Sequence, residues 1–324
     1  MLEFFTRKWS AIMHAGGARF TLPPVVYEIA PGFVAAARLD GSGRQKRRIR
    51  SIGVEPINTQ TVAPHLSRAN VADAEDLRRA TGSLMSTIGN GGGRYGLIVP
   101  DGAVRVTLLS FESLPDDPLE AEALIRWRMK DKLPYNPEEA RATFQVLGSE
   151  PGRMEVLAIA VRAAVLAEYE TALAPSNDGA ALILPATVAL LPLLSEGGAR
   201  AQLLLHVCAN WMTATVVAGA GPCVWRAREL EPEAMGSRAR EVASEAVRVL
   251  ASARDRLQAD LGRACLCVRP QPDGELVSAV SSAVGRKVEL MTPRVELGAL
   301  LSSSDRAVFE QFGATVAGLV ANVG

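Results

Sequence analysis

Histidine and cysteine, the side chains that most readily bind metals or act as nucleophiles, are scarce in this chain of 324 residues. They are His14, His65, His206, Cys208, Cys223, Cys265 and Cys267. None of their spacings matches a zinc site or a disulfide framework. Cys265 and Cys267 are two positions apart in an expected strand, so both side chains point to one face. The sequence therefore predicts free thiols and no metal site.

Other catalytic arrangements are not visible in the sequence either. It has no Gly-x-Ser-x-Gly motif and no Cys–His pairing for nucleophilic catalysis. The adjacent Glu138 and Glu139 fit a solvated strand start better than a general acid and base. The run from Asn90 to Gly93 follows an expected helix and lacks the Lys-Ser/Thr ending of a phosphate loop, so we interpret it as a linker.

The charge balance argues against nucleic acid as a partner. Lysine plus arginine equals aspartate plus glutamate, at 35 each, so the chain has no overall basic field. The basic run from Arg44 to Arg50 is interpreted as a solvated loop. The most apolar stretch, residues 180–194, contains two prolines and is too short to span a membrane. The N-terminus lacks the apolar core of a signal peptide, so we expect a cytoplasmic protein.

The elements that would position any site begin with a hairpin at residues 25–39, where Pro31-Gly32 separates two apolar runs. A strand at 49–54 follows, and then a helix from Asp73 to Gly89. The apolar face of this helix is formed by Leu77, Thr81, Leu84 and Ile88. A buried strand at 95–99 completes this part.

Residues 101–170 have a different pattern. A strand near 104–108 alternates apolar and polar residues. A helix begins near Leu119 and ends before Pro134. Two strands near 142–147 and 155–160 and a helix at 162–173 come next. This β-α-β-β-α order predicts a small α+β subdomain.

The second half repeats the plan of the first. We expect strands at 201–207, 212–217 and 223–226, a helix at 238–261 ended by Gly262, a strand at 264–268, a helix at 275–284, a strand at 288–290 and a closing helix at 305–321. Two halves that each begin with antiparallel strands and continue in strand–helix alternation suggest a duplicated α/β fold.

Residues 109–147 resemble a known family. They contain a Leu-Pro turn at Leu114-Pro115, a helix with Arg126-Trp127, a stop at Leu133-Pro134-Tyr135 and a strand ending in Phe144-Gln145-Val146-Leu147. This pattern is similar to the inserted subdomain of the PilM family, cytoplasmic actin-like proteins of type IV pilus assembly that are related to GspL and FtsA. The run from Phe312 to Leu319 is similar to the closing helix of the family.

The resemblance implies an α/β, two-lobed actin-like fold of the RNase H-like, ASKHA type, with an inserted small α+β subdomain. The expected parts are an N-terminal tail at 1–22, a first RNase H-like lobe at 23–100, the inserted subdomain at 101–170, and a second RNase H-like lobe with the closing helix at 171–324.

The nucleotide motifs of this superfamily are degenerate here. In the first phosphate hairpin, Glu28 stands where the family has aspartate and Ala30 where it has glycine. In the second, His206 and Cys208 replace the aspartate and the glycine. The Gly-rich adenosine turn aligns with residues 269–274, which keep one glycine. The sequence therefore predicts a non-hydrolysing pseudo-ATPase without a cofactor; whether ATP still binds is left open, and an active ATPase or kinase is the alternative.

The resemblance also implies partners. In the family, a groove between the first lobe and the inserted subdomain takes the cytoplasmic N-terminal segment of PilN, an inner-membrane protein with one span. Arg126, Trp127 and Tyr135 are the candidate contacts, although packing within the subdomain explains the aromatic residues equally well. We expect a scaffold at the cytoplasmic face of the inner membrane that contacts other assembly-platform proteins. A homo-oligomer and a peripheral membrane contact through residues 2–12 are possible. A GspL-type secretion component is the alternative.

Overall fold

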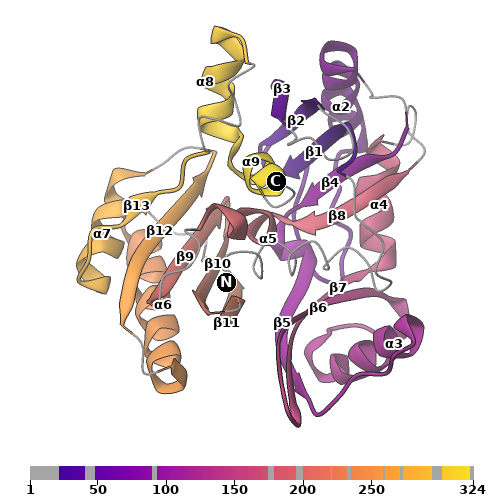
Figure 1. Cartoon of the computed structure of the whole chain (residues 1–324). Coiled ribbons are helices and arrows are strands. Elements are labelled where there is room, and N and C mark those ends of the chain that lie inside the picture. Colours follow the sequence, from indigo (N-terminus) through magenta and orange to yellow (C-terminus); the bar gives the residue numbers. More distant parts are fainter. Residues whose placement is uncertain are drawn as a thin grey trace.

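The structure, a computed structural model, describes residues 22–40, 48–89, 93–173, 179–194, 200–219, 221–231, 235–257, 260–270, 273–293 and 301–321. The expected N-terminal tail lies outside these residues except for Leu22, which is buried in the core. The described elements form two five-stranded sheets and one three-stranded sheet, with helices on their outer sides (Figure 1). Among them, no helix is long and apolar enough to cross a membrane.

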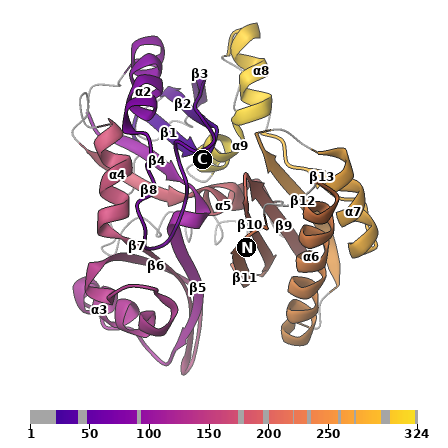
Figure 2. The ribbon, with the colours of Figure 1, turned by 180° about the vertical axis from the view of Figure 1, so that it is seen from behind.

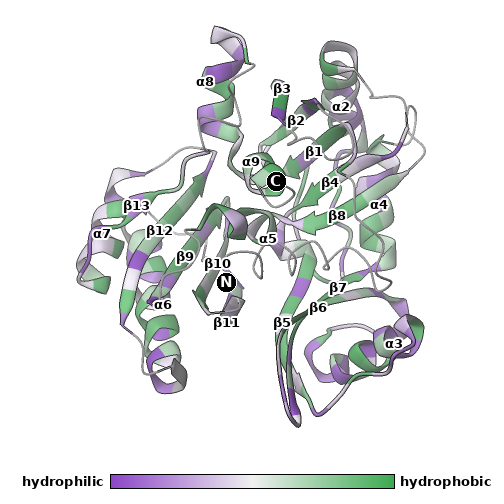
Figure 3. Cartoon of the chain, viewed as in Figure 1, coloured by the Kyte–Doolittle hydropathy of each residue, from purple (hydrophilic) through white to green (hydrophobic). Residues whose placement is uncertain are grey.

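The first sheet has the strand order β3-β2-β1-β4-β8. Its strands are β1 (Val25–Ala30), β2 (Phe33–Asp40), β3 (Arg48–Pro56), β4 (Tyr95–Val99) and β8 (Ala180–Pro185). The first three are antiparallel, whereas β4 and β8 run parallel to β1. The central strands are buried along their whole length, as continuous apolar runs require (Figure 3).

Helix α2 (Ala74–Ile88) covers the first sheet with the face that the sequence predicts. Leu77, Thr81, Leu84 and Ile88 are all buried. The Asp73 side chain accepts hydrogen bonds from the backbone N–H groups of residues 75 and 76, which caps the helix. Helix α4 (Ala163–Leu173) lies beside α2 on the same outer side, and the Thr81 hydroxyl donates to the Ala172 carbonyl over 2.9 Å.

The second sheet repeats the first, with the order β11-β10-β9-β12-β13. Its strands are β9 (Ala201–Cys208), β10 (Trp211–Ala218), β11 (Gly221–Glu229), β12 (Leu261–Arg269) and β13 (Glu289–Leu290). Helices α6 (Met235–Leu257) and α7 (Gly274–Val284) cover its outer side (Figure 2). The strand directions match those of the first sheet, so the expected duplication and two-lobed α/β fold are confirmed.

The inserted subdomain is an antiparallel sheet of order β5-β7-β6, made of β5 (Val104–Phe111), β7 (Arg153–Arg162) and β6 (Ala140–Glu150). Helix α3 (Pro118–Arg128) packs on one face through Ile125 and Met129. The other face, which includes Leu157 and Ile159, joins the core shared by the two lobes. One face of this sheet is therefore fixed to the body of the protein.

The structure differs from the sequence-based expectation in the sheet to which one strand belongs and in the ends of two helices. Strand β8 belongs to the first sheet, whereas residues after 170 were expected in the second lobe. Gly262 does not end a helix but lies in β12, where the strand pairs with β9 after an irregular step. The closing helix is divided into α8 (Ser303–Phe312) and α9 (Ala314–Ala321), with Gly313 between them. Helix α9 is buried against α5 (Ala186–Leu190).

Candidate functional site

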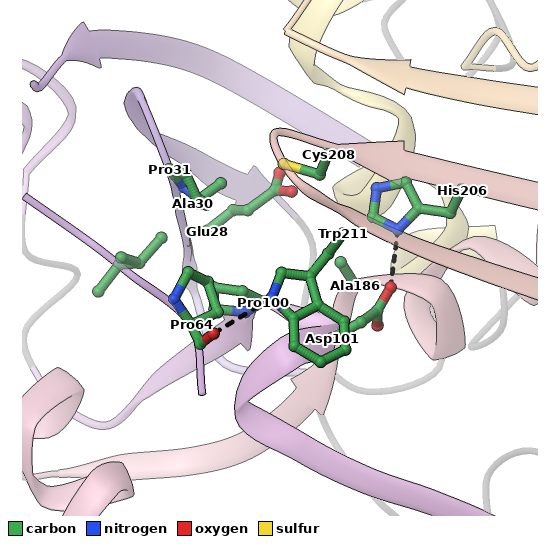
Figure 4. A pocket seen from close by; sticks show the side chains of 11 residues that line it. Glu28, Ala30, Pro31, Pro64, Pro100, Asp101, Ala186, His206, Cys208 and Trp211 are labelled. Atoms are coloured by element: carbon green, nitrogen blue, oxygen red, sulfur yellow. Dashed lines mark hydrogen bonds and ion pairs between the residues drawn. The ribbon is translucent and has the colours of Figure 1, made fainter. Parts of the chain in front are cut away.

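The two degenerate phosphate hairpins face each other across a narrow space between the lobes (Figure 4). The first hairpin contributes Glu28 and Ala30, and the second contributes His206 and Cys208. The interior of this space measures about 10 Å³, which is room for one water molecule. The four residues predicted as remnants of the nucleotide site are thus brought together, but in a space far smaller than an ordinary ligand pocket of several hundred Å³.

Glu28 is engaged by groups from the rest of the chain. Its side chain is 2% exposed, and one of its oxygens lies 2.8 Å from an Arg269 nitrogen at the end of β12. The same oxygen accepts a hydrogen bond from the Thr315 hydroxyl of α9 over 2.6 Å. The ion pair therefore links the two lobes, and Thr315 attaches α9 to the first-lobe carboxylate.

Arg269 is held on several sides. The same nitrogen that meets Glu28 donates to the Phe312 carbonyl over 2.9 Å, and the guanidinium lies over the Phe33 ring, 5.0 Å from its centre. Burial alone would lower the pKa of Arg269, but the Glu28 charge, with smaller effects of nearby thiols, raises it. A permanent cation thus stands beside the Glu28 carboxylate.

The thiols near this space are not activated. Burial raises the pKa of Cys208 to about 12 and that of Cys267 to about 11, and in both cases the positive charge of Arg269 opposes the shift only in part. Both thiols therefore stay protonated near neutral pH and are poor nucleophiles. All four cysteines are free, which confirms that part of the sequence analysis.

His206 belongs to a second buried network, centred on Asp101. The Asp101 carboxylate accepts hydrogen bonds from His206 Nδ1 at 2.8 Å, from the Thr213 hydroxyl at 3.1 Å and from the Thr187 backbone N–H at 3.0 Å. Burial alone would raise the pKa of Asp101, but the bonds from His206 and Thr187 outweigh it and hold the pKa below its usual value. An ionised carboxylate cannot donate, so His206 Nδ1 carries the hydrogen.

The Asp101 network also joins separate parts of the chain. Asp101 precedes β5 of the inserted subdomain, Thr187 lies on α5, and Thr213 lies on β10 of the second lobe. A separate contact lies nearby, since the Trp211 indole N–H donates to the Pro64 carbonyl over 3.1 Å. Sequence reasoning missed Asp101, Arg269 and Thr315, because their partners are distant along the chain and no local motif marks them.

The adenosine-turn remnant lies at the end of β12. Arg269 is turned toward Glu28, and Asp273 caps α7 by accepting hydrogen bonds from the backbone of Glu275 and Leu276. The two residues between Pro270 and Asp273 lie outside the described residues. In the described part of the turn, both charged side chains therefore serve the fold.

A wider cleft of about 650 Å³ opens beside the hairpin tips. It is formed by the loop between β3 and α2 and by the β9–β10 turn, and its charged lining residues, Arg68 and Glu229, have opposite signs. The loop is fixed from two sides, because Asp76 accepts from Asn58 and Thr61 and Glu168 accepts from Asn70 and Val71. No group of three or more potential metal ligands was found among the described residues.

The three predicted partner contacts are not brought together into one surface. Arg126 lies 3.7 Å from Glu122 on the same helix. Trp127 is 56% exposed on the outer side of α3, with the Lys130 ammonium 4.6 Å from its ring centre. Tyr135 instead packs partly buried against the cluster beneath α3. Trp127 is therefore exposed on one side of α3, whereas Tyr135 packs beneath the helix.

Comparison with known proteins gives matches in structure alone. No protein-family model matches the sequence, and no curated protein matches it. The solved PilM–PilN type IV pilus biogenesis complex is similar with a TM-score of 0.68 and 16% identity, over 94% of this chain and 99% of the matched chain. A Bacteroides thetaiotaomicron protein of unknown function with an actin-like ATPase fold has a TM-score of 0.50 and 8% identity, over 88% of this chain and 94% of its own.

These likenesses define the class of the protein. The chain has the actin-like fold. The duplicated sheets indicate the same fold, and the sequence resemblance of residues 109–147 implies it. Of these two structures, the PilM–PilN complex has the higher TM-score and matches almost the full length of both chains.

Proposed function

We propose that this chain is a PilM-like, non-hydrolysing scaffold of a type IV pilus or related secretion platform. In this proposal it acts at the cytoplasmic face of the inner membrane and binds the cytoplasmic N-terminal segment of a PilN-like protein. The likeness to a chain of the PilM–PilN complex over 94% of the sequence supports the assignment. A GspL-type secretion component is the alternative, and the genes that neighbour this one would distinguish the two.

The observation that carries the non-hydrolysing part is the buried pair of Glu28 and Arg269. Magnesium ions are held by carboxylate oxygens and phosphates, and they need those oxygens to be available. Here one Glu28 oxygen is taken by Arg269 and Thr315, and the space beside it is about 10 Å³. An active ATPase would have to separate this pair and open the cleft, so the proposed scaffold has no cofactor.

The proposed peptide site lies at the junction of the first lobe and the inserted subdomain. The Arg162 guanidinium donates to the Ser67 carbonyl across this junction. Glu168 receives the backbone N–H groups of Asn70 and Val71 on the same side, at 2.7 and 2.8 Å. These contacts hold the first-lobe loop against the end of β7 and against α4. A fixed junction suits the binding of an extended peptide because little further ordering is required.

The outer side of α3 is proposed as a contact for another platform protein. Leu119 and Trp127 are 76% and 56% exposed there, and Arg126 and Lys130 flank them. Large exposed apolar groups beside arginine are typical of the centre of a protein interface.

The experiment is a calorimetric titration of the full chain with a synthetic peptide. The peptide is the cytoplasmic N-terminal segment of the single-span membrane protein encoded next to this gene. We expect micromolar affinity, about −8 kcal/mol, because a short segment loses entropy when it becomes ordered. A scrambled peptide of the same composition is the control. Absence of binding at millimolar peptide would contradict the proposal.

A further inference from the structure

Arg105 is a half-buried cation in the inserted subdomain that has no acidic partner in the described part of the chain. It lies on β5, opposite Ala160 of β7, which pairs in turn with Ala142 of β6. These small neighbours lie on the face that α3 covers and leave room for a long side chain. The Nε atom of Arg105 is buried, and it makes no hydrogen bond to any described residue.

Other half-buried or buried arginines of this protein donate to a carboxylate or, as Arg38 and Arg238 do, to a backbone carbonyl. Arg162 meets Glu139 at 2.7 Å, Arg228 meets Glu241, and Arg269 meets Glu28 at 2.8 Å. Removing a cation from water without an acceptor is costly. Burial lowers the pKa of Arg105, and the one described group whose charge opposes that shift is Tyr135. Arg105 is therefore an exception that folding alone does not explain.

Tyr135 is the second unsatisfied donor at this place. Its hydroxyl oxygen is buried and has no hydrogen-bond partner among the described residues. Burial raises the pKa of Tyr135 to about 12, and the positive charges of Arg105 and Arg162 oppose this shift. The hydroxyl thus stays protonated near neutral pH and remains a donor. Because Arg162 also donates to Ser67, the Arg105 and Tyr135 pair lies close to the junction with the first lobe.

We propose that Arg105 and Tyr135 form a binding site for a carboxylate, supplied by an acidic side chain of a partner protein that docks at this junction. A guanidinium presents its donors in a plane that matches the two oxygens of a carboxylate. The phenol supplies a further donor, and the negative charge would compensate the unpaired cation. Arg105 as a whole residue is only half-buried.

The inference rests on the proposed function only in taking this junction as the partner-binding side. Its first test uses no PilN-like peptide, so its failure is distinguishable from failure of the peptide titration. The full chain is titrated with acetyl-triglutamate amide and with acetyl-triglutamine amide at equal ionic strength. Binding is followed by the arginine Nε–H resonances in a two-dimensional nitrogen–proton NMR spectrum, and Arg105→Met identifies the relevant signal by its loss.

The wild-type chain is expected to bind the glutamate peptide at millimolar concentrations, with a shift of the Arg105 signal, and to bind the glutamine peptide about tenfold or more weakly, because hydrogen bonds to charged groups are the stronger ones. Arg105→Met and Arg105→Lys should lose this preference, and Tyr135→Phe should reduce it. Tyr27→Phe is the matched control, because the Tyr27 hydroxyl is also buried without a described partner but lies in the first-lobe core. Equal binding of the two peptides by the wild type, or an unchanged preference in Arg105→Met, would overturn the proposal.

A second test measures stability without any ligand. Arg105→Met should raise the midpoint of thermal unfolding, because it removes an unpaired cation from a half-buried place and keeps the apolar stem. Arg162→Met is the control on the same sheet face, and it should lower the midpoint because it leaves Glu139 without its partner. A decrease in Arg105→Met as large as that in Arg162→Met would mean that Arg105 already has a partner, and the proposed site would be excluded.

Discussion

The cleft between the lobes and the inserted subdomain differ in whether a buried cation meets a carboxylate. In the cleft, Arg269 meets Glu28 and His206 meets Asp101, although Arg269 Nε and Nη1 and His206 Nε2 make no hydrogen bond to a described residue. In the subdomain, the half-buried Arg105 meets no carboxylate among the described residues, and its Nε and the nearby Tyr135 hydroxyl are buried without a described partner.

This difference indicates where a ligand is needed. A buried or half-buried cation without a counter-charge is unfavourable, so a ligand that brings a carboxylate would compensate Arg105 more than Arg269. By this criterion the cleft between the lobes already holds its own ion pair. The inserted subdomain is therefore the part that we propose to bind a ligand.

The largest effect is expected from breaking the ion pair in the cleft. Arg269→Met leaves Glu28 as an uncompensated buried charge, which should lower the free energy of unfolding by about 3–5 kcal/mol. Adding Glu28→Gln to Arg269→Met should restore most of the loss, because the charge is then removed as well. Urea unfolding of the two single variants and the double variant measures this. A loss below about 1 kcal/mol in Arg269→Met would mean that the pair does not hold the lobes together.

A smaller loss is expected where α9 meets α5. A Cβ atom on Gly318 would overlap the Ala189 carbonyl oxygen, so Gly318→Ala should move the helix that carries Thr315. We expect a cost of about 1–3 kcal/mol from this overpacking. Gly82→Ala is the control, since Gly82 is exposed on α2 with nothing near a new Cβ, and it should stabilise by about 0.5–1 kcal/mol. Two variants of equal stability would contradict the close contact.

The Asp101 network predicts a dependence of stability on acid. The folded-state pKa of Asp101 is below its ordinary value, so the unfolded chain takes up this proton at higher pH. The stabilisation is therefore present above about pH 4 and is lost as the pH falls through the folded-state pKa. Acid unfolding of the wild type should be steeper below about pH 4 than that of Asp101→Asn, which cannot titrate. Identical slopes would rule out this role for Asp101.

The smallest effect on stability is expected on the outer side of α3. Trp127 is more than half exposed, so Trp127→Ala should change the free energy of unfolding by less than about 0.5 kcal/mol. Ile125→Ala on the inner side of the same helix should cost about 2–5 kcal/mol, because Ile125 is fully buried. Thermal unfolding of the two variants makes the comparison. A large loss in Trp127→Ala would assign the indole to packing instead of to a partner.

The sequence predicts local elements better than it predicts the site. The hairpin of β1 and β2, the apolar face of α2 and the strand Tyr95–Val99 follow from short-range periodicity and turn residues. The place of β8 in the first sheet does not, because strand order depends on contacts across the whole chain. The Glu28–Arg269 pair joins residues 241 positions apart, and no motif marks Arg269 as the partner. The sequence predicts degenerate phosphate hairpins, but it does not predict that Glu28 pairs with Arg269.

The most direct test of the central claim is magnesium-dependent phosphate release from ATP by the purified full chain, with Glu28→Ala measured in parallel. If the cleft is closed by its own ion pair, the wild type should release phosphate no faster than a sample without protein, and Glu28→Ala should give the same result. Phosphate release by the wild type that requires magnesium and disappears in Glu28→Ala would contradict the account, because Glu28 would then be available to a bound nucleotide.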